Sequence, residues 1–209
     1  MKLHILVEGP AEAALLKGWL RRFLPGHTTS VIQHRGKGRL PASPLASPGP
    51  RREGLLDQLP AKLRAYGRSL NPATDRLLVL VDLDDDDCQE LKACLVRAWE
   101  SCDPQPVALF RIAIEETEAF YLGDPEAIRR AFPQARLAKL KAYEQDSICG
   151  TWELFQQVIQ DRLEDKVGWA EKMGEHLGTA WRGPGANRSP SFQQLCRALL
   201  WLAGESPSR

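Results

Sequence analysis

Two nearly continuous apolar stretches that end in acidic residues most constrain how this chain can fold. Residues 76–81 read RLLVLV and run into DLDDDD, and residues 107–114 read VALFRIAI and run into EETE. Short apolar runs of this kind are typical of central parallel strands that helices cover on both faces. With two further β-prone runs, the sequence predicts strands at 3–7, 31–33, 77–81 and 107–114.

Apolar residues at helical spacing separate these strands and predict helices over 11–24, 54–70 and 87–100. The alternation indicates an α/β fold with a mainly parallel, Rossmann-like sheet. After residue 115 the strand signal stops, and helical patterns cover 115–122, 125–132, 151–165, 167–177 and 190–203. Asp124-Pro125 and Ser189-Pro190 mark two helix starts, because each pairs a capping residue with a proline in the first turn.

We therefore expect an α/β domain over 1–125 and a helical C-terminal extension over 126–209 packed on it. Residues 39–52, RLPASPLASPGPRR, contain four prolines and predict a mobile loop inside the first domain.

Composition places the chain among ordinary globular proteins, because 43% of its 209 residues are hydrophobic and 26% are charged. No segment approaches the roughly 20 apolar residues that a membrane span needs. Glu8 interrupts the apolar N-terminal run, so we expect a strand there and a cytoplasmic protein without membrane association. Five cysteines without a C-x-x-C pair predict reduced thiols, and the sequence leaves the oligomeric state open.

The net charge of +1 hides an uneven distribution. Residues 1–70 contain 12 basic and 4 acidic residues, whereas residues 71–130 contain 6 basic and 14 acidic residues. An acidic middle beside a basic N-terminal third suits a site where carboxylates hold metal ions and basic groups hold phosphate.

Acidic residues follow three of the predicted strands, and the carboxyl ends of parallel strands meet at one edge of a sheet. Clustered carboxylates repel one another, and a divalent cation relieves that repulsion. Oxygen ligands favour a hard ion, so we expect Mg²⁺ or Mn²⁺. The predicted metal ligands are Glu8, Glu12, Asp82, Asp84, Asp86, Glu115 and Glu116. The predicted catalytic residues are Glu8, Asp82, Asp84 and Glu118, with Glu115 and Glu118 on one face of a helical turn.

Simpler readings compete for some of these acids. Asp85, Asp86 and Asp87 also suit a solvated loop that caps the following helix. Glu115 and Glu116 also suit the first turn of a helix, where the helix dipole stabilises acids.

Basic residues supply candidate contacts to a phosphate backbone, which would be independent of sequence and sensitive to salt. The candidates are His34, Arg35, Lys37, Arg39, Lys166 and Arg188. A solvated basic loop is an equally common use of the first four, and Lys166 equally suits an exposed helix face. Arg188 precedes a helix start, which either binds phosphate or is simply capped, with Phe192 packed beneath it.

The order of these motifs resembles the TOPRIM domain, the metal-binding fold of topoisomerases and primases. Glu8 in LVEGPAE and the Asp82-Leu83-Asp84 segment in VLVDLDDDD match its glutamate and Asp-x-Asp signatures. The E-G-x-x-E form is most similar to the TOPRIM domains of overcoming-lysogenisation-defect nucleases. That resemblance implies metal roles for Glu8, Glu12, Asp82 and Asp84.

A third motif, IAIEETEAFYLGDPEA, resembles a small bacterial TOPRIM-like family catalogued only as a domain of unknown function and often encoded beside ATPases. The similarity extends along the chain through HRGKG, GTWE at 150–153 and NRSPSF at 187–192. Phe120 departs from the pattern, which favours tryptophan there.

The resemblance implies a Mg²⁺- or Mn²⁺-dependent nuclease that acts on DNA or RNA in phage defence or nucleic-acid processing. The chain has no G-x-x-x-x-G-K-[ST] motif, so an ATP-driven step would need a separate ATPase partner. A non-catalytic TOPRIM-like module that binds a protein or nucleic acid is the main alternative. A phosphatase and a glycosyltransferase are weaker alternatives. The first strand ends in Glu8, where such phosphatases have their nucleophilic aspartate, and the sequence shows no nucleotide-sugar pocket that a glycosyltransferase would need.

Overall fold

The structure is a computed structural model that describes residues 1–205. Residues 206–209, the end of the expected C-terminal extension, lie outside the described residues. Four strands form one parallel sheet in the order β2-β1-β3-β4: β1 (Lys2–Val7), β2 (Thr28–Gln33), β3 (Asp75–Asp82) and β4 (Ala108–Ala113). The predicted α/β class with a parallel sheet is confirmed.

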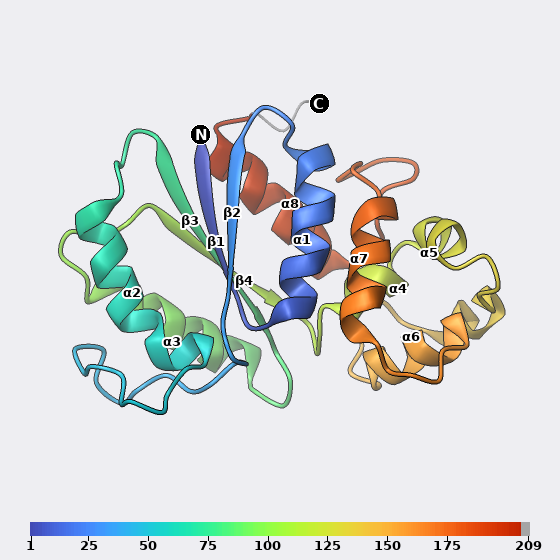
Figure 1. Ribbon diagram of the computed structural model, residues 1–209, viewed down its shortest axis with the longest axis horizontal. Coiled ribbons are helices and arrows are strands. Elements are labelled where there is room, and N and C mark those ends of the chain that lie inside the picture. The colour runs from blue at the N-terminus through green and yellow to red at the C-terminus, as the bar shows by residue number, and fades with distance from the viewer. Residues whose placement is uncertain (206–209) are drawn as a thin grey trace.

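Helices cover both faces of the sheet (Figure 1). The helices α2 (Leu55–Ser69) and α3 (Cys88–Glu100) cover one face, and α1 (Pro10–Phe23) and α8 (Pro190–Ala203) cover the other. Successive side chains of β3 alternate between two hydrophobic cores. Leu77 and Val79 pack with α2 and α3, whereas Leu78 and Leu80 pack with α1 and α8. Burial on both faces explains why this strand is continuously apolar.

The regular elements after β4 within the described residues are all helical. They are α4 (Glu118–Leu122), α5 (Pro125–Ala131), a 3-10 helix (Leu137–Ala142), α6 (Thr151–Ile159) and α7 (Lys166–His176), followed by α8. The predicted helix over 151–165 is too long, because Gln160 adopts a left-handed φ of 61° and ends α6. The 3-10 helix was not predicted.

The helix starts at Asp124-Pro125 and Ser189-Pro190 are confirmed. The Asp124 carboxylate accepts a hydrogen bond from the N–H of Ala127, and the Ser189 hydroxyl accepts one from Phe192. Both prolines are the first residue of their helix. The loop over 39–52 contains no helix or strand and contacts α2, where the Arg64 guanidinium donates to the carbonyl of Pro44.

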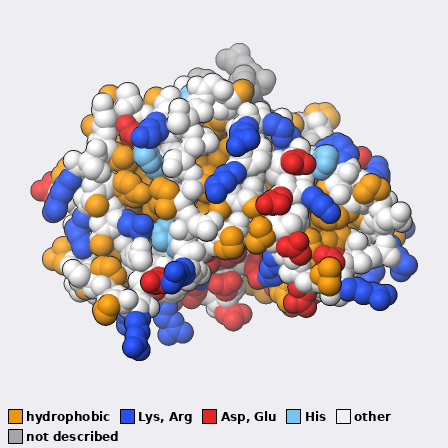
Figure 2. Space-filling view, in the orientation of Figure 1, with side chains coloured by type: hydrophobic (Ala, Val, Ile, Leu, Met, Phe, Trp, Pro, Cys, Tyr) orange, Lys and Arg blue, Asp and Glu red, His pale blue; other side chains and the backbone are white. Residues whose placement is uncertain are grey.

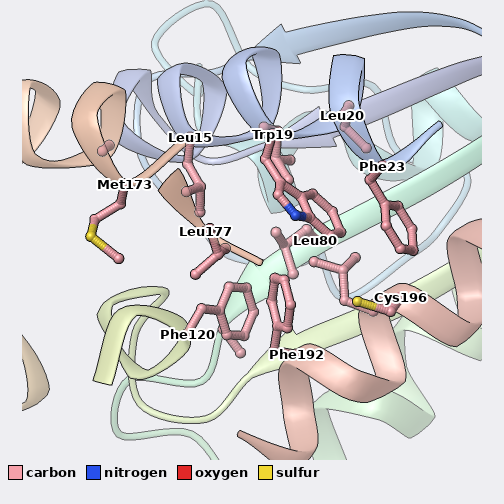
Figure 3. Close-up of a cluster of buried hydrophobic side chains, with 14 of the residues drawn as sticks. Leu15, Trp19, Leu20, Phe23, Leu80, Phe120, Met173, Leu177, Phe192 and Cys196 are labelled. Atoms are coloured by element: carbon pink, nitrogen blue, oxygen red, sulfur yellow. The ribbon is translucent and has the colours of Figure 1, made fainter. Parts of the chain in front are cut away.

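The C-terminal helices share a hydrophobic core with the sheet. Figure 3 shows Trp19 of α1, Phe120 of α4 and Phe192 of α8 gathered around Leu80 of β3. The ring centroids of Trp19 and Phe192 are 4.9 Å apart, and those of Phe120 and Phe192 are 5.2 Å apart. This packing fixes α4, and the acidic residue at its start, relative to the ends of the strands.

The contact between α1 and α7 depends on two glycines. Gly18 and Gly174 face each other, and a Cβ atom at Gly174 would lie 2.7 Å from the carbonyl oxygen of Leu15. The Trp19 indole N–H donates to the Gly178 carbonyl at 2.9 Å, and the Arg22 guanidinium donates to the carbonyls of Gly174 and Leu177, each at 2.7 Å. Close backbone approach and these polar contacts hold α7 against α1.

Two further expectations concern helix length and cysteine state. Within residues 1–205, no helix has the length and apolar character required to cross a lipid bilayer. All five cysteines are free thiols, of which Cys102 and Cys196 are buried and Cys149 is exposed.

We expect Gly174→Ala to lower the free energy of unfolding by about 1–3 kcal/mol, because the added methyl group forces α7 away from α1. At a helix position without a close neighbour, replacing glycine with alanine raises the free energy of unfolding by about 1 kcal/mol. A decrease in the Gly174→Ala protein would therefore indicate the close contact. Urea denaturation measures it. Glu171→Ala, at an exposed position of α7, is the control and is expected to change stability little. A Gly174→Ala protein as stable as the wild type would contradict the close approach.

Candidate functional site

Four buried carboxylates lie at the carboxyl end of the sheet, and we call them the acid cluster. Glu8 follows β1, Glu12 lies in the first turn of α1, Asp82 ends β3 and Glu118 begins α4. Glu8, Glu12 and Asp82 are each 9% exposed and Glu118 is 3% exposed. Figure 2 shows acidic side chains gathered at the lower middle of the molecule, where the strands of Figure 1 end.

The acid cluster is connected by hydrogen bonds as well as by charge. The backbone N–H of Asp82 donates to Glu8 Oε1 at 2.8 Å, which joins the ends of β1 and β3. The N–H of Gly9 donates to Glu12 Oε2 at 2.7 Å, which turns Glu12 back toward the end of β1. The predicted convergence of acids from three segments is thus present, but in a buried setting and not in the exposed cleft that a nuclease site suggests.

Burial and mutual repulsion raise the pKa values of all four carboxyl groups. Burial raises the pKa of Glu8 from 4.5 to about 7, and the charges of Asp84 and Glu12 raise it further. The hydrogen bond from the Asp82 N–H and the positive charge of Lys37 oppose this rise. Burial likewise raises the pKa of Glu118 to about 7. The pKa of Asp82 is raised well above its ordinary value by burial and then by Glu12, Glu8 and Glu118. Without a counter-cation, the acid cluster therefore retains protons at neutral pH.

The backbone beside the acid cluster adopts two unusual conformations. Asp84 has a φ of 48° and Glu115 has a φ of 62°, both in the left-handed region. They are hydrogen-bonded to each other, since the N–H of Asp84 donates to the Glu115 carbonyl at 2.9 Å. Left-handed residues other than glycine are uncommon and often occur at functional sites, because the strain needs surrounding structure to maintain it.

Lys37 contacts the acidic loop after β3. It lies between Gly36 and Gly38, whose φ angles of 86° and 69° are both in the left-handed region. The Lys37 ammonium group contacts Asp84 Oδ2 at 2.9 Å and Asp86 Oδ2 at 2.8 Å, and it donates to the Leu83 carbonyl at 2.8 Å. The predicted phosphate contact Lys37 and the predicted ligands Asp84 and Asp86 therefore form one charge network.

Lys166 lies near the acid cluster, at the start of α7. Its ammonium group is 3.4 Å from Glu116 Oε1 and 4.5 Å from the centroid of the Trp152 ring. Its charge counteracts the rise in the pKa values of Glu12 and Glu118. Lys166, unlike a lysine on a solvated helix face, thus interacts electrostatically with the acid cluster.

Glu115 has a different role from the one the sequence suggests. Helix α4 begins at Glu118, so Glu115 and Glu118 do not share a helical turn, and that prediction is wrong. The Glu115 carboxylate accepts hydrogen bonds from the N–H groups of Cys149, Gly150 and Thr151 at 2.7–3.2 Å. It thereby satisfies donors at the start of α6 that lack partners within the helix.

Asp87 confirms the simpler reading of its loop, because its carboxylate caps α3 by accepting from the N–H groups of Gln89 and Glu90. The remaining basic candidates are dispersed. Arg35 pairs with Glu53, and Arg39 and Arg188 are exposed. His34 is buried, and its Nδ1 is 2.7 Å from the Val7 carbonyl oxygen.

Tyr121 is a site residue that sequence reasoning missed, because its place in the apolar AFYL segment indicated only core packing. It is 0% exposed, and within the described residues its hydroxyl has no hydrogen-bond partner. Burial raises its pKa well above the ordinary value, and Glu118, Glu12 and Asp82 add to the shift in that order. An unpaired buried hydroxyl is thus placed beside the acid cluster.

The chemistry of the acid cluster suits a hard cation, although the ligands are not already arranged around one. Within residues 1–205, no three acidic, histidine or cysteine side chains form a ready-made metal site. The donors are all oxygen, and the buried Asp82 Oδ1 and Glu116 Oε2 have no hydrogen-bond partner in the described part of the chain. Unpaired buried carboxylate oxygens are costly, and Mg²⁺ or Mn²⁺ would satisfy them.

Comparison with known proteins gives one match. The family model described as "Domain of unknown function (DUF4276)" matches residues 7–200. The match includes the acid cluster and both lysines beside it, and it extends from the end of β1 into α8. No curated protein and no solved structure matches the chain.

We expect the metal-free protein to lose stability as pH rises from about 4.5 to about 8. The folded protein holds protons on Glu8 and Glu118 up to a pKa of about 7, whereas the unfolded chain releases them near 4.5. Between these values the folded state binds more protons, so rising pH favours unfolding. A loss of about 2 kcal/mol or more is expected, since one pKa unit corresponds to about 1.4 kcal/mol. Denaturation in EDTA across this pH range measures the loss.

Glu118→Gln is the matched variant, because it keeps the shape of the side chain and removes one titrating group. Its unfolding free energy should depend less steeply on pH than that of the wild type. Stability that is flat or increases with pH in the wild type would show that the acid cluster is not buried as described.

We expect Tyr121→Phe to leave the metal-free protein as stable as the wild type or more stable, by about 1 kcal/mol. The change removes an unpaired buried hydroxyl and keeps the ring, which packs against Phe155 with centroids 4.9 Å apart. Thermal denaturation in EDTA measures the effect, and Phe155→Leu, which disturbs the same packing without touching a hydroxyl, should destabilise. A clear loss of stability in Tyr121→Phe would mean that the hydroxyl has a partner in the folded protein.

Proposed function

The chain belongs to the DUF4276 family, and from its acid cluster we propose a divalent-metal-dependent TOPRIM-type nuclease that cleaves phosphodiester bonds. The observation that carries this proposal is the convergence of Glu8, Asp82 and Glu118, from three separate chain segments, with Lys37 and Lys166 close by. Burying several like charges is expensive, and a structural role alone does not require it. A cation that neutralises them gives the arrangement a purpose.

Glu8, Asp82 and Glu12 are the residues best placed to hold Mg²⁺ or Mn²⁺, with Asp84 and Glu118 beside them. When bound, such an ion polarises a phosphoryl oxygen and makes water a stronger nucleophile. Glu118, with a pKa of about 7, can take up and release a proton near neutral pH at its carboxylate. Lys37 and Lys166 can stabilise negative charge on the phosphate. Glu115 and Asp86 support this site through their hydrogen bond and ion pair, Glu115 by capping α6 and Asp86 by holding Lys37.

The parallel sheet supports the TOPRIM assignment. A glutamate after β1 and the Asp82-Leu83-Asp84 segment at the end of β3 lie on adjacent strands of the sheet, as the resemblance requires. The substrate is DNA or RNA, the location is the cytoplasm and the role is bacterial defence or nucleic-acid processing. The sequence has no phosphate-loop motif, so an ATP-driven step would come from a separate ATPase partner.

A second candidate function is a non-catalytic TOPRIM-like module that binds a protein or nucleic acid. The burial of the acid cluster favours it, since a substrate phosphate must reach the carboxylates. The two candidates differ in whether a cation enters the acid cluster and whether a phosphodiester is then cleaved.

We expect Asp82→Asn and Glu8→Gln each to abolish Mg²⁺- or Mn²⁺-dependent cleavage, by at least about a hundredfold. In EDTA, each variant should be equally or more stable than the wild type, because it removes a buried carboxyl group whose ionisation the neighbouring acids oppose. Cleavage of DNA and RNA substrates, with and without an ATPase partner, gives the first measurement, and thermal denaturation gives the second. Asp85→Asn removes an exposed charge from the same loop and should leave both unchanged.

Cleavage that persists in the Asp82→Asn/Glu8→Gln double variant would place the chemistry elsewhere. A wild-type protein that gains thermal stability from Mn²⁺ but cleaves nothing, even with an ATPase partner, would favour the non-catalytic module.

A further inference from the structure

A polar cavity of about 340 Å³ lies beside the end of β2, toward α2, and no step of the proposed function uses it. Its lining residues are Gln33, His34, Arg35, Glu53, Gln58 and Lys62. Residues 34–36 also form the edge of the acid cluster, because the N–H of His34 donates to the Val7 carbonyl and the N–H of Gly36 donates to the Glu8 carbonyl. The cavity and the acid cluster are therefore connected by one short backbone segment.

His34 has one nitrogen in use and one without a partner. Nδ1 is 2.7 Å from the Val7 carbonyl oxygen, which can only accept, so Nδ1 carries the proton. Nε2 is buried and has no hydrogen-bond partner within the described residues, and His34 as a residue is 8% exposed. Burial and the charge of Lys62 both lower the His34 pKa, so the neutral ring presents a free lone pair at Nε2.

Lys62 is the second group without a partner. Its side chain on α2 is half-buried, and within residues 1–205 it makes no hydrogen bond or ion pair. Burial lowers its pKa, and no acidic group offsets that shift. The only carboxylate in the lining belongs to Glu53, which already pairs with Arg35. A half-buried lysine without a carboxylate partner attracts an anion to the cavity.

We propose that this cavity binds a phosphomonoester, the terminal phosphate of a nucleic-acid strand. A phosphate group offers acceptor oxygens to the Lys62 ammonium group. It also forms a hydrogen bond with His34 Nε2, in which either the phosphate oxygen or Nε2 is the donor. Gln33 and Gln58 add amide groups that can bind further oxygens. Because Nε2 is itself buried, a phosphate oxygen reaches it only after a small shift of the side chains that line the cavity.

We call this cavity the phosphate pocket. The proposal that it binds phosphate depends only on its lining residues, and the assignment of that phosphate to a nucleic-acid strand rests on the proposed function. The sequence pointed to His34 and Arg35 as phosphate contacts, but gave no sign that Lys62, 28 residues after His34, lines the same cavity.

The test is equilibrium binding in EDTA, where no metal-dependent cleavage occurs. Three probes are compared at fixed salt concentration: inorganic phosphate, a 5′-phosphorylated oligonucleotide and the same oligonucleotide with a 5′-hydroxyl. We expect the wild type to prefer the 5′-phosphorylated strand by about tenfold, the scale of one charge-assisted hydrogen bond. Inorganic phosphate should compete with the 5′-phosphorylated strand for binding. It should also shift the His34 imidazole resonances in NMR spectra, which are identified by their absence from the spectrum of the His34→Gln variant.

Lys62→Gln should reduce the preference to about twofold or less, and Lys62→Arg should retain most of it, because arginine also donates to phosphate. Lys92→Gln removes an exposed lysine from α3, outside the cavity, and is the control for a general loss of positive charge. Equal affinity of the wild type for the two oligonucleotides, together with no effect of inorganic phosphate on His34, would overturn the proposal. So would a preference that survives Lys62→Gln.

The outcomes separate this proposal from the proposed function. Phosphate binding that depends on Lys62, with no oligonucleotide binding, would support the phosphate pocket and contradict a nucleic-acid substrate. Loss of cleavage in Asp82→Asn with an unchanged preference for the 5′-phosphate would support both.

Discussion

The burial of carboxylates against one another at the carboxyl end of the sheet is the constraint on which the rest of this structure depends. Four acids that are 9% exposed or less would strongly destabilise the fold if all were charged. The protein limits this cost in three ways that the structure makes visible. Protons remain on Glu8 and Glu118 up to a pKa of about 7, backbone N–H groups donate to Glu8 and Glu12, and two lysines lie close by.

The helical C-terminal half contributes to the same end of the sheet and is not merely an appendage. Its aromatic residues pack with Trp19 of α1, and α7 approaches α1 through Gly18 and Gly174. This packing places Glu118 and Tyr121 against the ends of β1 and β3, and it brings Lys166 to Glu116. Removing the C-terminal helices would therefore remove part of the acid cluster as well as half of the core.

The basic residues of the N-terminal third divide into two groups with different partners. Lys37 turns toward Asp84 and Asp86, whereas His34 and Arg35 line a cavity with Lys62. Three residues within a four-residue segment thus serve two neighbouring surfaces, and the left-handed glycines Gly36 and Gly38 flank Lys37. A phosphate-rich ligand could use both surfaces at once, one at the acid cluster and one at the phosphate pocket.

The sequence by itself determined the parallel sheet and the acids at its carboxyl end. Both follow from local patterns: apolar runs such as 76–81 form buried strands, and Glu8 and Asp82 come directly after such runs. The helix starts at Asp124 and Ser189 could also be predicted from local sequence, since a cap and a proline act within one turn.

Tertiary structure alone decided what each acid contacts. Glu115 turned to the N-terminus of α6, more than thirty residues away, and Tyr121 came to lie beside Asp82, because packing between distant segments set those positions. Burial of the acid cluster, and with it the raised pKa values, likewise arises only when α1, α4 and the strand ends close together, since desolvation depends on the surrounding atoms and not on neighbours in the sequence.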